Sequence, residues 1–404
     1  MRPGQIGAVA LALGGLLACA GDGCSCADAS PDAVRSEHQP STHVSASETA
    51  SSETKTSPPP IDMYAKDTMS IEEEFERYVR GILECVKDEP TCPRAAKVGR
   101  KMARRALSDA RAGKENRLKD LWRLSVARML DEPLARLRLE ITHVLKIAVK
   151  GAPDFRASLL ELLEDESDPM AAQNLGEMFA GAMAKEDDAL KDRLTAYLLR
   201  MDATKPGLID GQIGVWQSLE TFIRTEERWL ETAHTCLVKT PNRRLQSVLT
   251  RIMRYAPDIH HARTTKVLAD LMKRRRSSKD LSLVSSTVET LGKLGHARAI
   301  DSIEEAVRTR YHQRSFLPSA ALGLYHLAQH PESQKDGARI VASAEQILAI
   351  PGLSLVAYRY SLYAIRDSGA PTAQALLKAY TKHPDNEARK IAVQALLGVG
   401  KLTP

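Results

Sequence analysis

The chain has 404 residues and a formal net charge of +6, and 43% of its residues are hydrophobic. Aromatic residues make up only 4%, which argues against a surface that binds sugars by stacking. Only six cysteines are present, and three of them fall within residues 19–26, directly after an apolar run. Their position bears on where the protein resides.

Residues 1–18 are typical of a secretion signal. Arg2 is their only charge, and the apolar run AVALALGGLLA at residues 8–18 is too short for a mature membrane span. The sequence LLAC at residues 16–19 resembles the lipobox of bacterial lipoproteins. The resemblance implies that the signal is cut before Cys19 and that Cys19 carries fatty acyl chains. The alternative is an ordinary secretion signal followed by incidental cysteines.

Two neighbouring cysteines fit the lipobox less well. Asp22 and Cys24 stand two residues before Cys24 and Cys26, where that family has a small or apolar residue. The residue after Cys19 is Ala20, whereas an Asp at that place often retains lipoproteins at the inner membrane. The resemblance therefore implies a lipid anchor in the outer membrane that faces the periplasm.

Residues 19–68 form a predicted linker that is rich in Ser, Thr, Ala, Glu and Pro. Such a segment buries too little apolar surface to offset its ordering entropy, so we expect a disordered spacer with a reach of roughly 40 Å. Residues 20–70 hold eight acids and three bases. Since Arg2 is the only earlier charge, the part from Ile71 onward keeps a net charge of +10. A basic body attracts anionic lipids, acidic glycans or acidic proteins, and an envelope address disfavours nucleic acid.

Residues 69–404 keep one helical period throughout, which predicts an all-α fold. In IEEEFERYVRGILECV the apolar residues recur at spacings of three and four, as on an amphipathic helix. Proline and glycine fall between such segments, and strand signals are nearly absent. We expect roughly fourteen to sixteen helices of about ten to twenty residues. The apolar positions of the first helix are Ile71, Phe75, Tyr78, Val79, Ile82 and Val86.

A repeated pair of residues indicates that the helices are organised in units. An aliphatic residue is followed four positions later by a small one, and successive aliphatic residues lie 39, 33, 41 and 31 positions apart. This is about the length of a helix pair with its turns. The pairs are Ile252 with Ala256, Leu291 with Gly295, Leu324 with Ala328, Ile365 with Gly369, and Leu396 with Gly400.

The stretch TLGKLGHARAIDSIEEAV is similar to HEAT repeats, with Leu291, Gly292, Leu294, Gly295, Ala299 and Ile300 at the matching places. The resemblance implies a right-handed α-solenoid of HEAT-like helix pairs over residues 69–404. It is clearest over residues 240–404 and faint over residues 71–239, where another type of helical repeat stays open. The segment GLIDGQIGVWQSLETFIRTEERWL departs from the pattern and obscures its phase.

Cys85 and Cys92 flank Pro90 in the segment CVKDEPTCP. On one continuous helix they lie about 10 Å apart, too far for a disulfide. Pro90 and Pro93 predict instead that one helix ends near Asp88 and the next begins near Pro93. In an oxidising envelope the hairpin predicts a disulfide, and the alternative is two unpaired buried thiols.

Two basic clusters are candidate anion-facing patches. One is Arg100, Lys101, Arg104 and Arg105 in GRKMARRALSDAR, and the other is Arg274, Arg275 and Arg276 in MKRRRSSKD. The competing interpretation is a solvated helix face and an exposed loop.

No catalytic, metal-binding or phosphate-binding motif is recognisable, so we expect no enzyme, metal, cofactor or small-molecule substrate. The adjacent His260 and His261 point about 100° apart on a helix, which is poor geometry for one metal. Cys236 is interpreted as a small buried residue. Tyr358, Tyr360 and Tyr363 either line a groove or, as we favour, pack between repeats. The predicted function is an envelope lipoprotein that serves as a protein-binding scaffold; the alternative is an envelope enzyme or its accessory subunit.

Overall fold

The computed structural model describes residues 69–398, apart from residues 89–92, 152–154, 182–187, 203, 276–279 and 311. Every regular element within these ranges is a helix, which confirms the predicted all-α class. None of the described helices has the length and apolar character needed to cross a bilayer. The predicted signal peptide, the lipidated Cys19 and the linker lie outside the described residues.

The described part contains eighteen α-helices, which is more than the fourteen to sixteen expected. The expectation was too low because some helices are too short to show a clear apolar stripe in the sequence. Examples are α6 with nine residues and α17 with eight. The helices are α1 (Ile71–Asp88), α2 (Pro93–Arg111), α3 (Asn116–Asp131), α4 (Ala135–Ala148), α5 (Arg156–Asp165), α6 (Pro169–Glu177), α7 (Asp188–Leu198), α8 (Leu208–Leu219), α9 (Glu227–Lys239), α10 (Arg243–Ile252), α11 (His261–Arg274), α12 (Leu281–Leu294), α13 (Ala299–Arg310), α14 (Leu317–Ala328), α15 (Gly337–Leu348), α16 (Leu355–Asp367), α17 (Ala373–Tyr380) and α18 (Asn386–Leu396).

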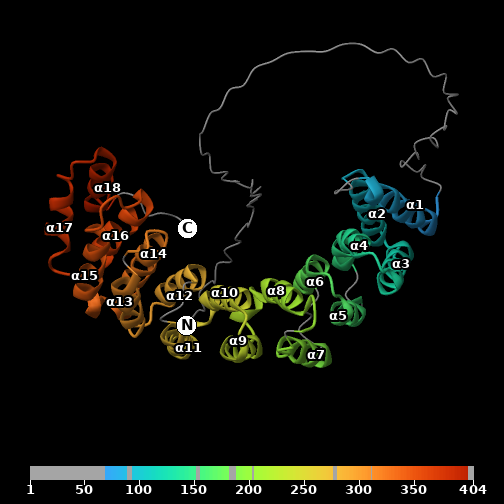
Figure 1. The fold of residues 1–404 in the computed structure, drawn as a ribbon, viewed down its shortest axis with the longest axis horizontal. Helices are drawn as coiled ribbons and strands as arrows, with labels where there is room; N and C mark the ends of the chain where they lie inside the picture. Colours follow the sequence, from blue (N-terminus) through green and yellow to red (C-terminus); the bar gives the residue numbers. More distant parts are fainter. Residues whose placement is uncertain are drawn as a thin grey trace, which may run out of the picture. The chain divides into compact units, whose positions relative to one another are not determined.

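The helices pack in two layers that follow the chain. From α2 to α18, each even-numbered helix contacts the even-numbered helix before it and the one after it. The odd-numbered helices α3 to α15 contact one another in the same stepwise way, and α1 packs against α2, α3 and α4. Figure 1 shows the even-numbered helices lying side by side in chain order.

Side-chain caps mark the starts of even-numbered helices. At five of them the residue before the helix accepts a hydrogen bond from the backbone N–H three positions on, which contributes about 0.5–2 kcal/mol each. Two of these helices, α6 and α10, lie on either side of the segment in which the sequence pattern loses its phase. The capping residues are Asp168, Asn242, Asp280, Ser354 and Asp385.

An arginine in the first turn plays the same part at two distant places. Arg138 is the fourth residue of α4, and its Nη1 donates to the carbonyls of Glu132 and Pro133 at 2.9 and 3.1 Å. Arg389 is the fourth residue of α18, and its Nη1 donates to two carbonyls of the preceding turn, both at 2.8 Å. The starts of α4 and α18 therefore share a hydrogen-bonding pattern that the sequence analysis did not predict.

The predicted apolar positions lie in the core. On α1 the described members of the stripe, from Ile71 to Ile82, are at most 6% exposed. The five aliphatic residues of the repeated pair lie on α10, α12, α14, α16 and α18, so the repeat follows the even-numbered helices. Four are fully buried and Leu396 is half-buried. Gly295 ends α12 with a φ of +68°, the left-handed conformation in which glycine commonly ends a helix.

Glycines set the closest helix contacts. A Cβ at Gly176 on α6 would overlap the backbone of Gly211 and Val215 on α8, and one at Gly292 on α12 would overlap the backbone of Gly323 on α14. In GLIDGQIG, Gly214 thus serves the close contact of α8 with α6, a Cβ at Gly211 would overlap Tyr197 on α7 and Leu163 on α5, and Gly207 serves the turn. This is why that segment does not match the spacing of the other repeats.

A buried histidine makes the stability of the fold depend on pH. His234 on α9 is 5% exposed, and its Nε2 lies 3.2 Å from Thr264 Oγ1 on α11. Burial lowers the pKa of His234 to about 4, against the smaller opposing effect of Glu231, and Arg263 and His260 lower it further.

Because this pKa is depressed in the folded state, the stability is fully present above the unfolded value near 6.5 and is lost as the pH falls toward 4. We expect a loss of roughly 2–3 kcal/mol between pH ~7.5 and ~4.5 that His234→Gln does not show. Urea unfolding of both proteins at the two pH values measures it. Equal losses in both would contradict the assignment to His234.

Candidate functional site

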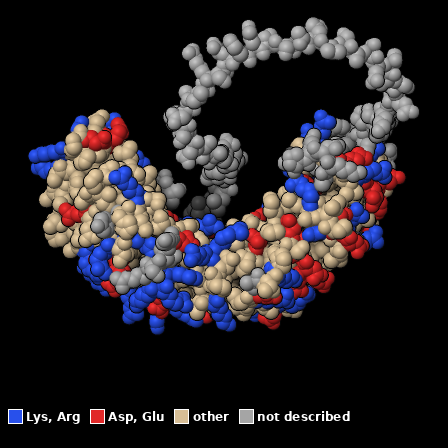
Figure 2. Space-filling view, in the orientation of Figure 1, with Lys and Arg blue, Asp and Glu red and all other residues tan. Residues whose placement is uncertain are grey.

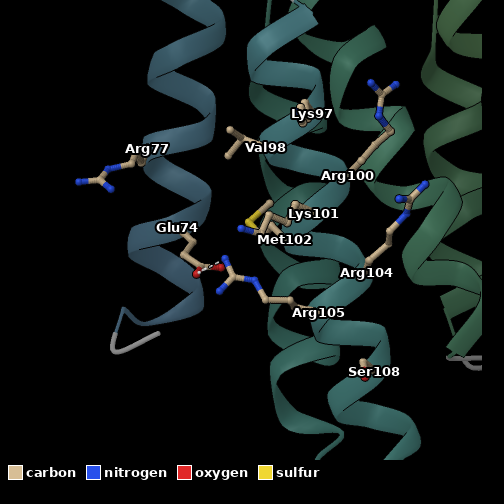
Figure 3. Close-up of a pocket in the computed structure, with 10 residues that line it drawn as sticks. All are labelled: Glu74, Arg77, Lys97, Val98, Arg100, Lys101, Met102, Arg104, Arg105 and Ser108. Carbon is tan, nitrogen blue, oxygen red and sulfur yellow. Dashed lines mark ion pairs between the residues drawn. The ribbon is translucent and has the colours of Figure 1, made fainter. Parts of the chain in front are cut away.

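A basic cleft lies between the first two helices. It has a volume of about 390 Å³, and its lining contains six cationic side chains and one carboxylate. Val98 and Met102 contribute the apolar part of the lining. Figure 3 shows the residues that line it: Glu74 and Arg77 from α1, and Lys97, Val98, Arg100, Lys101, Met102, Arg104, Arg105 and Ser108 from α2.

The first predicted basic cluster forms one side of this cleft. Arg100, Lys101 and Arg104 are exposed on α2, whereas Arg105 is half-buried. Figure 3 shows Arg105 turned toward α1, while Arg100 and Arg104 extend from the other side of α2. The cations therefore spread over a broad surface instead of converging on one point, an arrangement that suits an extended anion.

Glu74 connects α1 to α2 and α3 through ion pairs. Its side chain is 5% exposed, and it forms ion pairs with Arg105 on α2 at 3.1 Å and with Arg117 on α3 at 2.9 Å. Because this single carboxylate is shared by two arginines, the cleft keeps an excess of positive charge, with six cations against one carboxylate in its lining. The buried ion pairs thus fix the position of α2 while its exposed face stays positive.

The spacing of the cations has a cost. Lys97 and Lys101, and likewise Arg100 and Arg104, stand four residues apart on α2 and therefore face the same side of the helix. Like charges at this spacing destabilise a helix by about 0.2–0.5 kcal/mol per pair. A bound anion removes that repulsion, which gives a physical reason for the arrangement.

The second predicted cluster lies on another surface. Arg274 is exposed at the end of α11, and Arg276 lies outside the described residues. Arg275 has a packing role, since its Nη2 donates to Gln246 Oε1 at 3.1 Å and its carbonyl accepts from Arg310. Because α11 packs against α9, α12 and α13, this cluster and the basic cleft are separate.

Figure 2 gives the distribution of charge on one face of the molecule. Lys and Arg gather over the region that Figure 1 labels α11 and α13, whereas Asp and Glu are frequent near α1 and α3. The cleft between α11 and α13, about 420 Å³, is lined by cations together with Asp301 and Glu305. Its mixed charge makes it a weaker anion site than the basic cleft.

The cysteines differ in state. Cys85 is disulfide-bonded, and α1 ends at Asp88 while α2 begins at Pro93, as the prolines predicted. Cys92 lies outside the described residues, so its pairing with Cys85 stays a prediction. Cys236 is fully buried, as expected, and burial raises its pKa to about 12.

The remaining candidates occupy packing positions. His261 Nε2 lies 3.0 Å from the carbonyl oxygen of Ala256, and no group of three metal-ligating side chains occurs within the described ranges. Tyr358 and Tyr363 are at most 5% exposed, which confirms that they pack between helices. Tyr360 is half-buried, with its ring centroid 5.6 Å from that of Tyr325 on α14.

Sequence reasoning missed three charged residues of the cleft, namely Glu74, Arg77 and Lys97. Glu74 could have been found from the sequence, because it stands on the apolar stripe of α1 between Ile71 and Tyr78. A charged residue at such a buried position requires a partner of opposite charge. Arg77 and Lys97 could not have been found from the sequence, since a single exposed cation on a helix is ordinary. No protein-family model matches the chain, and no curated protein matches it either.

Proposed function

We propose that this protein is a lipid-anchored scaffold of the bacterial cell envelope that binds a protein partner along the face formed by its even-numbered helices. In this proposal Cys19 carries the lipid, residues 19–68 are the tether, and the helical body stands in the periplasm, anchored to the outer membrane. The helical body is a right-handed α-solenoid of HEAT-like pairs.

The stepwise packing of the even-numbered helices carries the proposal. Because each even-numbered helix from α2 to α18 packs against the neighbouring even-numbered helices, we expect this layer to present one continuous surface. Such rows of helix pairs typically serve protein–protein contact. The caps at Asp168 and Asp385, and the equivalent bonds of Arg138 and Arg389, support one repeat type along the whole body.

The basic cleft supplies a charged end to this surface. Three exposed cations of α2, Arg100, Lys101 and Arg104, project beyond the buried ion pairs of Glu74. Electrostatic attraction of this kind speeds association with an acidic partner and weakens with salt. We therefore expect the partner to present acidic residues to α2.

The anchor predicts a simple fractionation result. Replacing Cys19 with Ser removes the sulfur that carries the acyl chains, so the variant should leave the membrane fraction nearly completely. Ala20→Ser, which leaves the cysteine in place, is the control. Labelled fatty acid should enter the wild type and not the Cys19→Ser variant. A variant that still pellets with the outer membrane, together with an unlabelled wild type, rules out the anchor.

The binding surface is tested by affinity purification from an envelope extract. The full chain in neutral detergent should recover one protein in a fixed ratio, and Arg100→Glu with Arg104→Glu should lower the recovery by tenfold or more, because the charge on α2 is reversed. The matched control reverses two exposed cations outside the cleft, Lys266→Glu with Arg298→Glu.

The outcomes separate the candidate functions. Recovery that both double variants reduce equally indicates attraction by net charge alone and contradicts a specific contact at α2. Recovery or turnover of cell-wall fragments in place of a protein would replace the scaffold with an envelope enzyme or its accessory subunit.

A further inference from the structure

Three cations from successive helix pairs gather on one tyrosine ring. Tyr255 lies in the short 3-10 helix Met253–Tyr255 that follows α10. The guanidinium carbon of Arg224, from the 3-10 helix Phe222–Arg224 after α8, lies 4.8 Å from the ring centroid. Arg254 lies at 5.2 Å, and Lys293 Nζ, from the last turn of α12, lies at 6.0 Å. With Glu220 they form what we name the Tyr255 cluster.

The positive charge of the Tyr255 cluster is poorly balanced. Glu220 is the acidic member, and its hydrogen bond to Tyr255 raises the pKa of the phenol. Burial lowers the pKa of Lys293, and the nearby charges of Arg254 and Arg224 lower it further. Among the described residues no ion pair joins a carboxylate to any of the three cations, and Arg254 Nε is buried without a hydrogen-bond partner. The cluster therefore carries three cations against one carboxylate, and an added anion would balance its net positive charge.

An aromatic strip continues from the Tyr255 cluster along the next two even-numbered helices. His326 on α14 lies next to Lys293, and burial together with Lys293 lowers its pKa to about 4, so it is uncharged at neutral pH. Its ring centroid is 5.5 Å from that of Tyr325, which lies 5.6 Å from Tyr360 on α16. Tyr325 is 5% exposed and holds the strip together from below, whereas His326 and Tyr360 are half-buried and form its accessible part.

The succession from cations to aromatic rings indicates which class of ligand can bind here. Carboxylates form strong charge-assisted hydrogen bonds with arginine, and aromatic rings favour an apolar or aromatic side chain nearby. Neighbouring helices stand about 8–10 Å apart, a distance that an extended peptide covers in about three residues. A peptide can therefore place an acidic side chain at the cluster and an aromatic one at the strip.

We infer that the Tyr255 cluster binds an acidic side chain of an extended segment of the partner protein, whose following aromatic residue lies against the accessible parts of His326 and Tyr360. This inference rests on the proposed scaffold function and adds a second contact, distinct from the basic cleft on α2. Both sites lie on elements that belong to, or directly follow, the even-numbered helices.

The test is a titration of the full chain, in neutral detergent, with the labelled peptide Glu-Glu-Glu-Ala-Phe-Ala and its counterpart Gln-Gln-Gln-Ala-Phe-Ala. The acidic peptide should bind at least tenfold more tightly, and Arg254→Gln with Lys293→Gln should remove about that factor. Arg224→Gln, at an exposed position, is a second variant that spares the fold. Lys266→Gln on α11 is the matched control and should bind like the wild type.

Several results overturn the inference. Equal binding of the two peptides is one, and cluster variants that bind the acidic peptide as well as Lys266→Gln does are another. Displacement of the peptide by inorganic phosphate at the same concentration would mean that the cluster binds any anion. If the variants lose binding to anionic phospholipid vesicles but still bind the peptide, the cluster binds lipid headgroups instead. If the envelope partner is recovered equally by the wild type and by Arg224→Gln with Lys293→Gln, this contact fails and the scaffold stands. If the peptide binds but no envelope partner is recovered, the peptide contact stands and the proposed scaffold function fails.

Discussion

Replacing Leu291 with Ala is expected to lower the free energy of unfolding by about 2–5 kcal/mol. Leu291 is fully buried on α12, which packs against α10, α13 and α14. The substitution removes buried methyl groups and leaves a cavity. The neighbours cannot close it easily, because Gly292 and Gly323 already bring α12 and α14 into backbone contact.

Urea unfolding followed by circular dichroism measures the loss. The control is Leu130→Ala on α3, where the leucine is 56% exposed, and the expected change is within about 0.5 kcal/mol. Similar losses for the two variants would contradict the assignment of Leu291 to the core between helix pairs.

The second large effect is expected for Gly295→Val, at roughly 2–6 kcal/mol. Two costs combine there. Gly295 has a φ of +68°, which strains a β-branched residue by about 1–3 kcal/mol. Its Cβ would also overlap the imidazole of His330, and such overpacking costs about 1–3 kcal/mol more. The turn cannot shift freely, because Ser333 Oγ donates to the carbonyl of Gly295 at 2.9 Å.

A second glycine separates the two costs. Gly113 also has a positive φ, +83°, but a Cβ there meets no atom within 4 Å. Gly113→Val should therefore show only the backbone strain, about 1–3 kcal/mol. His330→Ala should recover stability in the Gly295→Val protein. Equal losses at the two glycines, with no recovery, would mean that the contact with His330 is unimportant.

Local features of the sequence predicted the helices well where proline or apolar periodicity was strong. Pro90 and Pro93 located the break between α1 and α2, and the apolar periodicity located the buried stripe of α1. The number of helices was underestimated, since a helix of eight or nine residues such as α17 or α6 shows barely two turns of a stripe. The glycines of α8 concealed its place in the series because they serve contacts with residues distant in sequence, Gly214 with α6 and Gly211 with Tyr197 and Leu163.

The candidate sites were predictable only in part, for a related reason. Arg100 and Arg104 stood out as a run of cations on one helix. The Tyr255 cluster did not, because its members come from three separate turns and each is an ordinary surface residue in its own segment. Periodicity reports how one helix faces the core, whereas such a cluster depends on which turns the packing brings together.

Hydrogen exchange on the Leu291→Ala protein tests most directly whether each helix pair is coupled mainly to its neighbours. In such a row, damage at α12 spreads only locally. We expect amide protection to fall over residues 250–330, around α12 and the helices that contact it, with residues 71–130 largely unaffected. Equal loss along the whole chain would instead reveal one globally cooperative bundle. The continuous face of even-numbered helices, and the scaffold function that depends on it, would then lose their basis.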